Sequence, residues 1–283
     1  YGDVAFDYAY TPSFPDLVTD HIRTILAANV GTVTLGGDHF ITLPILKAYA
    51  EKYGAMSVIH FDAHSDLWAD DDMSRIDHGT FMYKAVKLGL VDPARSIQIG
   101  IRTECDDYCG MDYIDARAVH EKGTGWAVAQ AKAKVGDNPT YITFDIDALD
   151  PAFAPGTGTP VWGGLTSWQA AAMLRDLAGI NLVGGDIVEV SPPYDTTGAT
   201  AIAGAHVQVT CSRLEVDVAA VVVRVRIRPG HHDHASRVGD VGVGRHGVAR
   251  QIVGARAGVV DVELAVGLVV GVEGHAEQAL LVA

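Results

Sequence analysis

Residues 56–66, MSVIHFDAHSD, decide the fold of this chain. The first four are apolar or small and predict a short buried strand, which ends in Asp62, His64 and Asp66. Because unpaired buried charge is costly, these polar groups need a partner. Carboxylate oxygen and imidazole nitrogen suit manganese, iron or zinc, and no thiolate lies nearby. The stretch therefore predicts a divalent metal site at the end of a strand, with a solvated loop as the alternative.

Two other segments also place polar side chains at the end of a strand. The β-branched run TVTL at residues 32–35 is followed by two glycines and His39, and YITF at residues 141–144 leads into Asp145 and Asp147. Further strands are predicted over residues 96–101 and 181–190. Helices are predicted over residues 16–29 with Asp16 as a cap, 41–53, 81–88, 125–135 and from Thr166 to Gly179. Strands that alternate with helices indicate a mostly parallel sheet in a three-layer α/β/α fold.

The ends of these strands hold a set of candidate metal ligands. In open parallel sheets, ligands bind beyond the carboxyl ends of the strands. Two metal ions need bridging carboxylates, and alternate residues at a strand end point to the same side. Such a pair of ions, about 3.5 Å apart, lowers the pKa of the water between them, which favours hydrolysis. The six candidates are His39, Asp62, His64, Asp66, Asp145 and Asp147.

Composition narrows the class of partner. The chain has 283 residues, is 48% hydrophobic and carries a net charge of -14. It shows no convincing membrane span or signal segment, and three cysteines are too few for a disulfide framework, so we expect a cytoplasmic protein. The acidic balance makes nucleic acid an unexpected partner, because phosphate binding needs a basic surface. It favours a small cationic substrate instead.

The character of the chain changes after residue 208. Residues 1–208 carry the whole net charge, whereas residues 209–283 contain 8 acidic and 8 basic residues and no Phe, Tyr, Trp, Met, Lys or Asn. We interpret 1–208 as a catalytic domain and 209–283 as an anomalous tail that is out of frame or disordered. A strand-rich second domain is the alternative. Within the tail, we do not expect the cluster at residues 231–234 to be a functional site.

Several motifs together resemble the signatures of the ureohydrolases, the arginase and agmatinase family. They are GGDH at residues 36–39, FDAHSD at 61–66 and FDIDALDP at 144–151, followed by APGTGTP at 154–160. DHGTF at residues 77–81 and QIGIRT at 98–103 most resemble bacterial agmatinases. The resemblance extends in order from residue 1 to about residue 206. It implies an arginase-like fold, two Mn²⁺ ions per subunit, a guanidino substrate and a homo-oligomer.

The resemblance also implies a role for each matching residue. One manganese would be held by His39, Asp62, Asp66 and Asp145, and the other by His64, Asp62, Asp145 and Asp147, with Asp62 and Asp145 bridging. Water activated by the ions would attack the guanidinium carbon and pass its proton to Asp147. His78 would carry a proton to the leaving amine, and Glu189 would pair with the guanidinium group.

The expected reaction is hydrolysis of agmatine to putrescine and urea. Arginases hold the α-carboxylate of their substrate partly through an Asn shortly after the DAHxD motif, where Leu67 and Trp68 stand here. Three aspartates at residues 70–72 would repel a carboxylate and attract the distal ammonium of agmatine. The alternatives are that this triplet is only a solvated loop and that the substrate is another guanidino compound, as for a guanidinobutyrase or an arginase.

Three other hypotheses compete with this reading. A metallophosphoesterase would need a later Gly-Asn-His motif, which the sequence lacks. Deacetylases related in fold use fewer acidic ligands and one zinc ion. The third is an inactive metal-binding fragment, because family members carry further sequence before the point that corresponds to Tyr1. We therefore expect a fold truncated at the N-terminus, and poor solubility.

Overall fold

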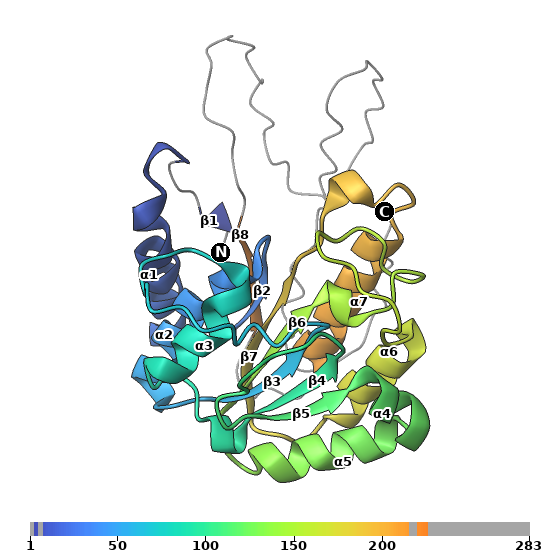
Figure 1. Cartoon of the computed structure of the whole chain (residues 1–283). Coiled ribbons are helices and arrows are strands. Elements are labelled where there is room, and N and C mark those ends of the chain that lie inside the picture. Colours follow the sequence, from blue (N-terminus) through green and yellow to red (C-terminus); the bar gives the residue numbers. More distant parts are fainter. Residues whose placement is uncertain (1–2, 5–7, 215–219, 226–283) are drawn as a thin grey trace, which may run out of the picture. The chain divides into compact units, whose positions relative to one another are not determined.

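A parallel sheet of eight strands runs through the part of the chain that the computed structural model describes, namely residues 3–4, 8–214 and 220–225 (Figure 1). The strands are β1 (Asp3–Val4), β2 (Gly31–Leu35), β3 (Ser57–Phe61), β4 (Ile97–Ile101), β5 (Asp112–Asp115), β6 (Thr140–Asp145), β7 (Leu182–Val188) and β8 (Ala220–Val225). Their order across the sheet is β1-β8-β2-β7-β6-β3-β4-β5. Every neighbouring pair is parallel.

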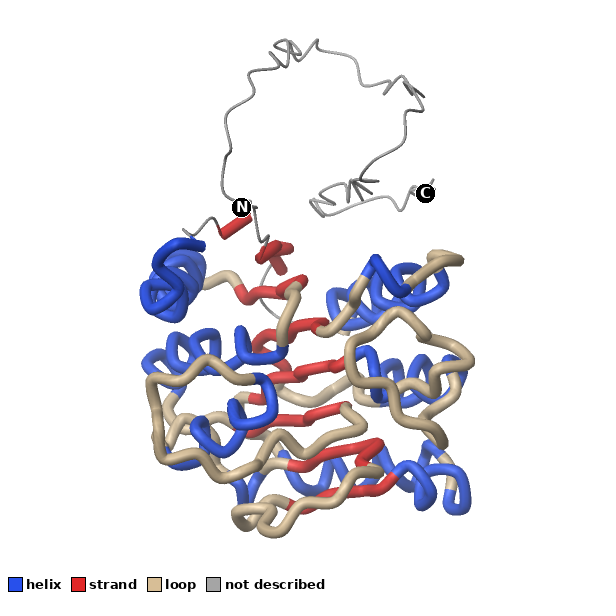
Figure 2. The backbone as a smooth tube through the Cα atoms, turned by 45° about the horizontal axis from the view of Figure 1, so that its top comes forward, coloured by secondary structure: helices blue, strands red, loops and turns tan. Residues whose placement is uncertain are grey.

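Helices cover both faces of this sheet, as Figure 2 shows. One layer contains α1 (Phe14–Ala27), α2 (Thr42–Tyr53) and α3 (Phe81–Lys87). The other contains α4 (Ala116–Lys122), α5 (Thr124–Val135), α6 (Ser167–Asp176) and α7 (Ala199–Arg213). Each layer encloses its own apolar core against the sheet. The predicted three-layer α/β/α fold with a parallel sheet is confirmed.

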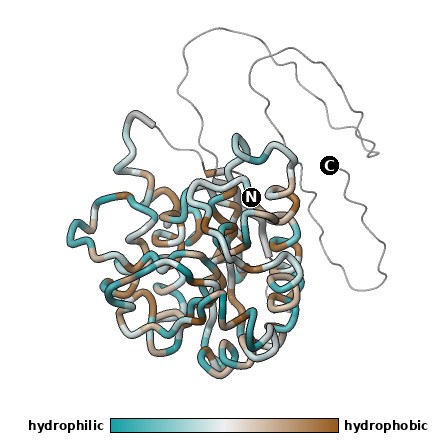
Figure 3. The backbone as a smooth tube through the Cα atoms, turned by 45° about the vertical axis from the view of Figure 1, so that its right-hand side comes forward, coloured by the Kyte–Doolittle hydropathy of each residue, from teal (hydrophilic) through white to brown (hydrophobic). Residues whose placement is uncertain are grey.

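Side chains alternate between the two cores along the central strands β3, β6 and β7. In β3, Val58 packs in the core under α1–α3, whereas Ile59 and Phe61 pack in the core under α4–α7. Because both faces are covered, the central strands β3, β4, β6 and β7 are buried along their whole length. The helices show the complementary pattern in Figure 3, where brown hydrophobic segments alternate with teal hydrophilic ones, as expected of helices with one buried face.

Local signals fix most helix boundaries. Helix α6 begins with the predicted Thr166 cap, which forms a capping box with Gln169. Helix α1 begins earlier than predicted, at Phe14, with Pro15 in its first turn. Asp16 therefore lies inside the first turn and is not the cap, although its charge there still favours the positive end of the helix dipole. The segment before α1 contains β1 and a 3-10 helix, Tyr8–Ser13.

The sequence did not predict the edge strand β5 or the following helix α4. Only Ile114 is buried in β5, so this strand gives almost no hydrophobic signal. No helix among the described residues is long and apolar enough to span a bilayer.

Only a small part of the predicted tail lies within the described residues. Helix α7 continues past residue 208 to Arg213, and β8 pairs in parallel with β2 and β1. Residues 215–219 and 226–283, including the histidine cluster at 231–234, lie outside the described residues. The boundary at 208 and the interpretation of the tail stay predictions.

Candidate metal centre

The six predicted ligands lie together at the carboxyl ends of β2, β3 and β6. His39 opens a 3-10 turn after β2, Asp62 directly follows β3, and Asp145 is the last residue of β6. All are buried except His64, which is partly exposed. Parallel strands end at the same edge of a sheet, so residues more than 100 positions apart in the sequence meet here.

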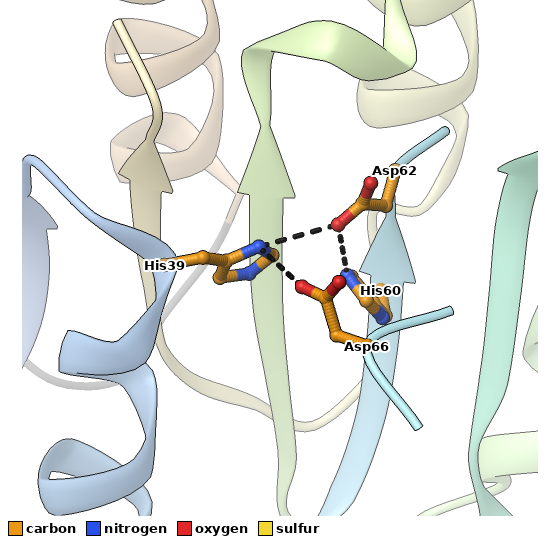
Figure 4. Close-up of side chains that lie close together, drawn as sticks. All are labelled: His39, His60, Asp62 and Asp66. Atoms are coloured by element: carbon orange, nitrogen blue, oxygen red, sulfur yellow. Dashed lines mark hydrogen bonds and ion pairs between the residues drawn. The ribbon is translucent and has the colours of Figure 1, made fainter. Parts of the chain in front are cut away.

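One group of ligands converges on the imidazole of His39. Its Nδ1 atom lies 3.1 Å from Oδ2 of Asp66, and 3.2 Å from Oδ2 of both Asp62 and Asp145. Figure 4 shows His39, Asp62 and Asp66 pointing toward one another from separate segments. Nδ1 is buried and has no hydrogen-bond partner in the described part of the chain. A buried nitrogen that faces three carboxylates is the arrangement expected of a metal ligand.

The opposite ring nitrogen of His39 determines its tautomer. Nε2 lies 2.8 Å from Oγ1 of Thr143, and that hydroxyl donates its only hydrogen to Asp186 Oδ1 at 2.6 Å. Thr143 can therefore only accept from His39, so Nε2 carries the ring hydrogen. Nδ1 then presents its lone pair to the carboxylates, as metal-binding histidines do when their other nitrogen is hydrogen-bonded.

A second group forms around His64. Its Nδ1 atom lies 3.0 Å from Asp147 Oδ2 and 3.3 Å from Asp62 Oδ1. Asp62 thus faces His39 with Oδ2 and His64 with Oδ1, as expected of a bridging ligand. Asp145 faces His39 with Oδ2, whereas its Oδ1 accepts a hydrogen bond from the backbone of Asp147 at 2.8 Å. Its predicted bridging role stays a prediction.

The charges in this cluster are not balanced by the protein. Burial and the neighbouring Asp147 and Asp62 raise the pKa of Asp145 well above its ordinary value. Burial and Asp62 also raise the pKa of Asp147 to about 6. Burial alone would lower the pKa of His64, but hydrogen bonds to Asp147 and Asp62 outweigh it and raise this pKa to about 11. Without a metal, the positive charge in this cluster therefore comes from protonated histidine. Divalent cations would supply more positive charge at the same carboxylates.

The donor set fits a pair of divalent cations. Among the described residues, only histidines form ion pairs with the four aspartates of the ligand set, namely Asp62, Asp66, Asp145 and Asp147. Four carboxylates and two imidazoles without thiolate are typical of manganese, iron or zinc. Asp66 also adopts a left-handed backbone conformation, φ 52°, which is uncommon for a residue other than glycine.

The two predicted catalytic residues outside the ligand set lie beside it. Glu189 follows β7 at φ 61°, and its Oε1 accepts a hydrogen bond from the backbone N–H of His39 at 2.7 Å. His78 Nδ1 lies 3.4 Å from that same oxygen and 3.9 Å from Asp38 Oδ2. The Glu189 contact outweighs burial and, with Asp38, raises the pKa of His78 to about 9. The His78 side chain is 45% exposed, so it lies at the rim.

Two aspartates of the acidic triplet at residues 70–72 make contacts that hold its loop in place. Asp70 Oδ2 lies 3.1 Å from Nζ of the fully buried Lys84, which also donates to the carbonyl oxygen of Arg75 at 2.6 Å. Asp72 accepts hydrogen bonds from the backbone and hydroxyl of Ser74. The triplet therefore has a structural role that its sequence did not reveal, and only Asp71 is left as a plain surface charge.

Comparison with known proteins identifies the family. A sequence profile of the Arginase family matches residues 1–212. The chain belongs to the arginase family. It is 50% identical to the agmatinase of Chromobacterium violaceum over 208 residues, which are 73% of this chain and 65% of that protein. It is 51% identical to the agmatinase of Proteus mirabilis over 206 residues, 73% of this chain and 67% of that protein.

Solved structures agree with this membership. A hypothetical agmatinase from Burkholderia thailandensis matches with a TM-score of 0.73 and 54% identity, over 75% of this chain and 68% of that one. The proclavaminate amidinohydrolase of Streptomyces clavuligerus matches with a TM-score of 0.70 and 38% identity, over 74% and 71%. This member of the arginase family thus spans about two thirds of the length of the curated relatives it matches.

Proposed function

We propose that this chain is an agmatinase-like amidinohydrolase that uses two Mn²⁺ ions to cleave agmatine to putrescine and urea. The observation that carries the proposal is the position of Asp62. Its two carboxylate oxygens lie 3.2 Å from Nδ1 of His39 and 3.3 Å from Nδ1 of His64. A carboxylate between two separate imidazoles suits a bridge between two ions. The identity of about 50% to agmatinases supports the proposed reaction.

The six ligands divide into two sets that share members. One ion would be held by His39, Asp62, Asp66 and Asp145, and the other by His64, Asp62, Asp145 and Asp147. Bound cations of this kind supply Lewis acidity and make water a nucleophile near neutral pH. Manganese is the proposed metal because oxygen ligands predominate in both sets.

Glu189 is proposed to bind the substrate guanidinium group. A carboxylate can accept two parallel N–H bonds from a guanidinium, which fixes the orientation of that group as well as attracting its charge. Glu189 is held in place by the backbone N–H of His39. Glu189 is therefore in direct contact with a member of the ligand set. This position suits a group that must hold the guanidinium carbon close to the ions.

Two other residues are proposed to move protons. Asp147 Oδ2 is within 3.0 Å of His64 and 3.2 Å of the Thr159 hydroxyl, and it would accept the proton released when water attacks the guanidinium carbon. His78, whose pKa is raised to about 9, is protonated at neutral pH and would donate its proton to the leaving amine. Its exposed position at the rim suits exchange of that proton with solvent.

The preference for agmatine over arginine rests on the relatives rather than on the acidic loop. Asp70 is paired with Lys84, and Asp72 Oδ1 accepts hydrogen bonds from Ser74, so both carboxylates already have partners in the fold. Trp68 lies next to the ligand His64, with their ring centroids 6.3 Å apart, and is 44% exposed. This aromatic residue beside the site would favour an alkyl chain without a carboxylate. Cytoplasmic location and homo-oligomer formation stay predictions from the sequence.

Urea release by the full chain tests the proposal. The protein is loaded with Mn²⁺, its metal content is measured, and urea is assayed with agmatine, arginine and 4-guanidinobutyrate. We expect two Mn²⁺ per chain and a clear preference for agmatine over the other two substrates. His39→Asn should lose urea release from agmatine. The matched control His206→Gln changes a surface histidine remote from the site.

Other outcomes support the competing hypotheses. Equal urea release from arginine would contradict the specificity, and bound manganese without urea from any substrate would favour an inactive metal-binding fragment. Hydrolysis of a chromogenic phosphodiester in place of agmatine would favour a metallophosphoesterase.

A further inference from the structure

His60 lies against the ligand set but was not among the predicted ligands. It is the last residue but one of β3, is fully buried, and points to the same face of the strand as Asp62. Its Nε2 atom lies 2.7 Å from Asp62 Oδ2. Figure 4 marks this contact with a dashed line. By distance alone, His60 belongs with His39, Asp62 and Asp66 in a group that could hold a metal ion. Its other contacts determine whether it can.

The register of the sheet places Gln98 beside His60. These two residues are direct partners in the pairing of β3 with β4. On the other side of His60, its partner in β6 is Thr143, the residue that orients His39. A buried row of polar residues therefore crosses the sheet one step below the ligands.

The hydrogen bonds of Gln98 leave one assignment. Gln98 Nε2 lies 2.7 Å from the backbone carbonyl oxygen of Ser65, which can only accept, so the amide atom at this position is the nitrogen. The same nitrogen lies 2.8 Å from Nδ1 of His60 and has a second hydrogen to donate. Nδ1 of His60 must therefore accept, and the ring hydrogen of the neutral imidazole is on Nε2.

We infer that His60 is a positioning residue for the bridging carboxylate Asp62 rather than a metal ligand, and that Gln98 fixes the tautomer of His60 for this task. Nε2 donates its hydrogen to Asp62 Oδ2 and has no lone pair to offer a cation. The inference rests on the proposed function, because Asp62 needs positioning only if its two oxygens serve two ions. The chain of donors from Gln98 through His60 then fixes which oxygen of Asp62 faces His39 and which faces His64.

The tautomer of His60 can be observed without any metal. The full chain is labelled with ¹⁵N-histidine, freed of metal at neutral pH, and studied by long-range ¹H–¹⁵N correlation, with His60→Gln to assign the signals. We expect the Nε2–H tautomer. Zn²⁺ is then added as a diamagnetic probe: the Nδ1 signals of His39 and His64 should shift strongly, whereas His60 should keep its Nε2 hydrogen.

Two results would overturn the inference, namely an Nδ1–H tautomer in the metal-free chain and loss of the Nε2 hydrogen of His60 when Zn²⁺ binds. If Zn²⁺ shifts none of the three histidines, the metal site itself is wrong, although the metal-free tautomer still stands. The failure of the inference and the failure of the proposed function are therefore distinguishable.

Substitutions test the same donors through metal affinity. Gln98→Glu has nearly the same shape but cannot donate, so His60 should switch to the Nδ1–H tautomer, and Mn²⁺ affinity should fall about 10- to 100-fold. His60→Gln keeps an N–H near Asp62 and should lose less affinity than His60→Leu. As a matched control, Tyr49→Phe removes a buried hydroxyl that binds Thr32 and the backbone of Val183, remote from the ligands. It should lower thermal stability but keep Mn²⁺ affinity, whereas wild-type affinity in Gln98→Glu and His60→Leu would contradict the inference.

Discussion

The two acidic regions of this molecule, the ligand set and the loop at residues 70–72, handle their charge in opposite ways. In the ligand set, burial raises the pKa of Asp66, Asp145 and Asp147, and only at Asp62 do contacts with His60, His39 and His64 outweigh burial and lower the pKa. In the loop, hydrogen bonds from the backbone of residue 72 and from Lys84 lower the pKa of Asp70, and bonds from Ser74 lower that of Asp72. In the loop, a lowered pKa means that hydrogen bonds or a cation of the protein already stabilise the carboxylate. A buried carboxylate with a raised pKa needs a cation that the chain does not provide.

The largest effect should follow from removing one charge from the ligand set. Asp145→Asn keeps the acceptor for the Asp147 backbone N–H but removes a buried anion. We expect urea release to fall by at least about 10³-fold, or about 4 kcal/mol of barrier. The metal-free variant should melt higher than the wild type, because repulsion with Asp62 and Asp147 is relieved. A urea assay measures the loss of activity, and calorimetry of the two metal-free proteins measures their melting temperatures. A lower melting temperature in Asp145→Asn would contradict the claim that the ligand set carries uncompensated negative charge.

In the loop, the opposite change should destabilise. Lys84→Met removes the buried cation that serves Asp70, and we expect the melting temperature to fall by roughly 5–10 °C. The stoichiometry of bound manganese should not change. Lys84→Met combined with Asp70→Asn should recover part of the loss, since no uncompensated carboxylate is then left. If the double variant is as unstable as the single one, the ion pair is not what holds the loop.

Acidity should affect metal-free and manganese-loaded protein differently. The pKa of Asp147 is raised from 3.8 to about 6, so the folded chain binds this proton more tightly than the unfolded chain does. Its contribution to stability is fully present below pH 3.8 and is lost as the pH rises through about 6. Thermal unfolding of the metal-free protein from pH 4 to pH 7 should show this loss, and Asp147→Asn should reduce it. The stabilisation by added Mn²⁺ should grow over the same range.

Glu189 lies between the two kinds of carboxylate, because its partners are a backbone N–H and a histidine. Its contact with His78 raises the pKa of that histidine from 6.5 to about 9. In Glu189→Gln we expect this pKa to fall toward 6.5, which NMR titration of the metal-free protein measures. An unchanged value would mean that Asp38 rather than Glu189 holds the proton on His78.

The smallest effect is expected at the surface of the loop. Asp71 is exposed, so Asp71→Asn should change stability by less than about 0.5 kcal/mol. Its effect on the KM for agmatine should also be small, roughly twofold at most, because one solvated charge attracts a cation weakly. A larger rise in KM would support the hypothesis that the acidic loop attracts the ammonium group of agmatine.

The sequence predicted the elements whose hydrophobic pattern is strong. The buried strands β2, β3, β4, β6 and β7 each contain apolar or β-branched residues within an almost fully buried segment, and the six ligands lie at or beyond the ends of three of them. Strand β5 was missed because three of its four residues are exposed, so its pattern resembles that of a loop. Helix α4 was missed with it, although Asp115 caps it through the backbone of Ala118.

The parts of the site that were missed depend on contacts between strands. Nothing near His60 in the sequence indicates that Gln98 lies opposite it, because the pairing of β3 with β4 sets that neighbour. The loop at residues 70–72 was interpreted as free charge for a similar reason. Its partner, Lys84, is on α3 and is identical in sequence terms to any surface lysine until its burial is known.

The place of β7 in the sheet has a consequence for how the protein folds. This strand is the seventh along the chain, yet it lies between β2 and β6. His39, which follows β2, therefore cannot reach Asp62 and Asp145 by native pairing until residues 182–188 have been synthesised and inserted between the two halves of the sheet. A nascent chain that stops short of this strand would hold His39 apart from Asp62 and Asp145, although His64 would already be next to them in the β3–β6 half of the sheet. A divalent cation held by the set that includes His39 can therefore stabilise only the finished sheet, whereas the set around His64 lies on the segments that follow β3 and β6, which pair directly with each other.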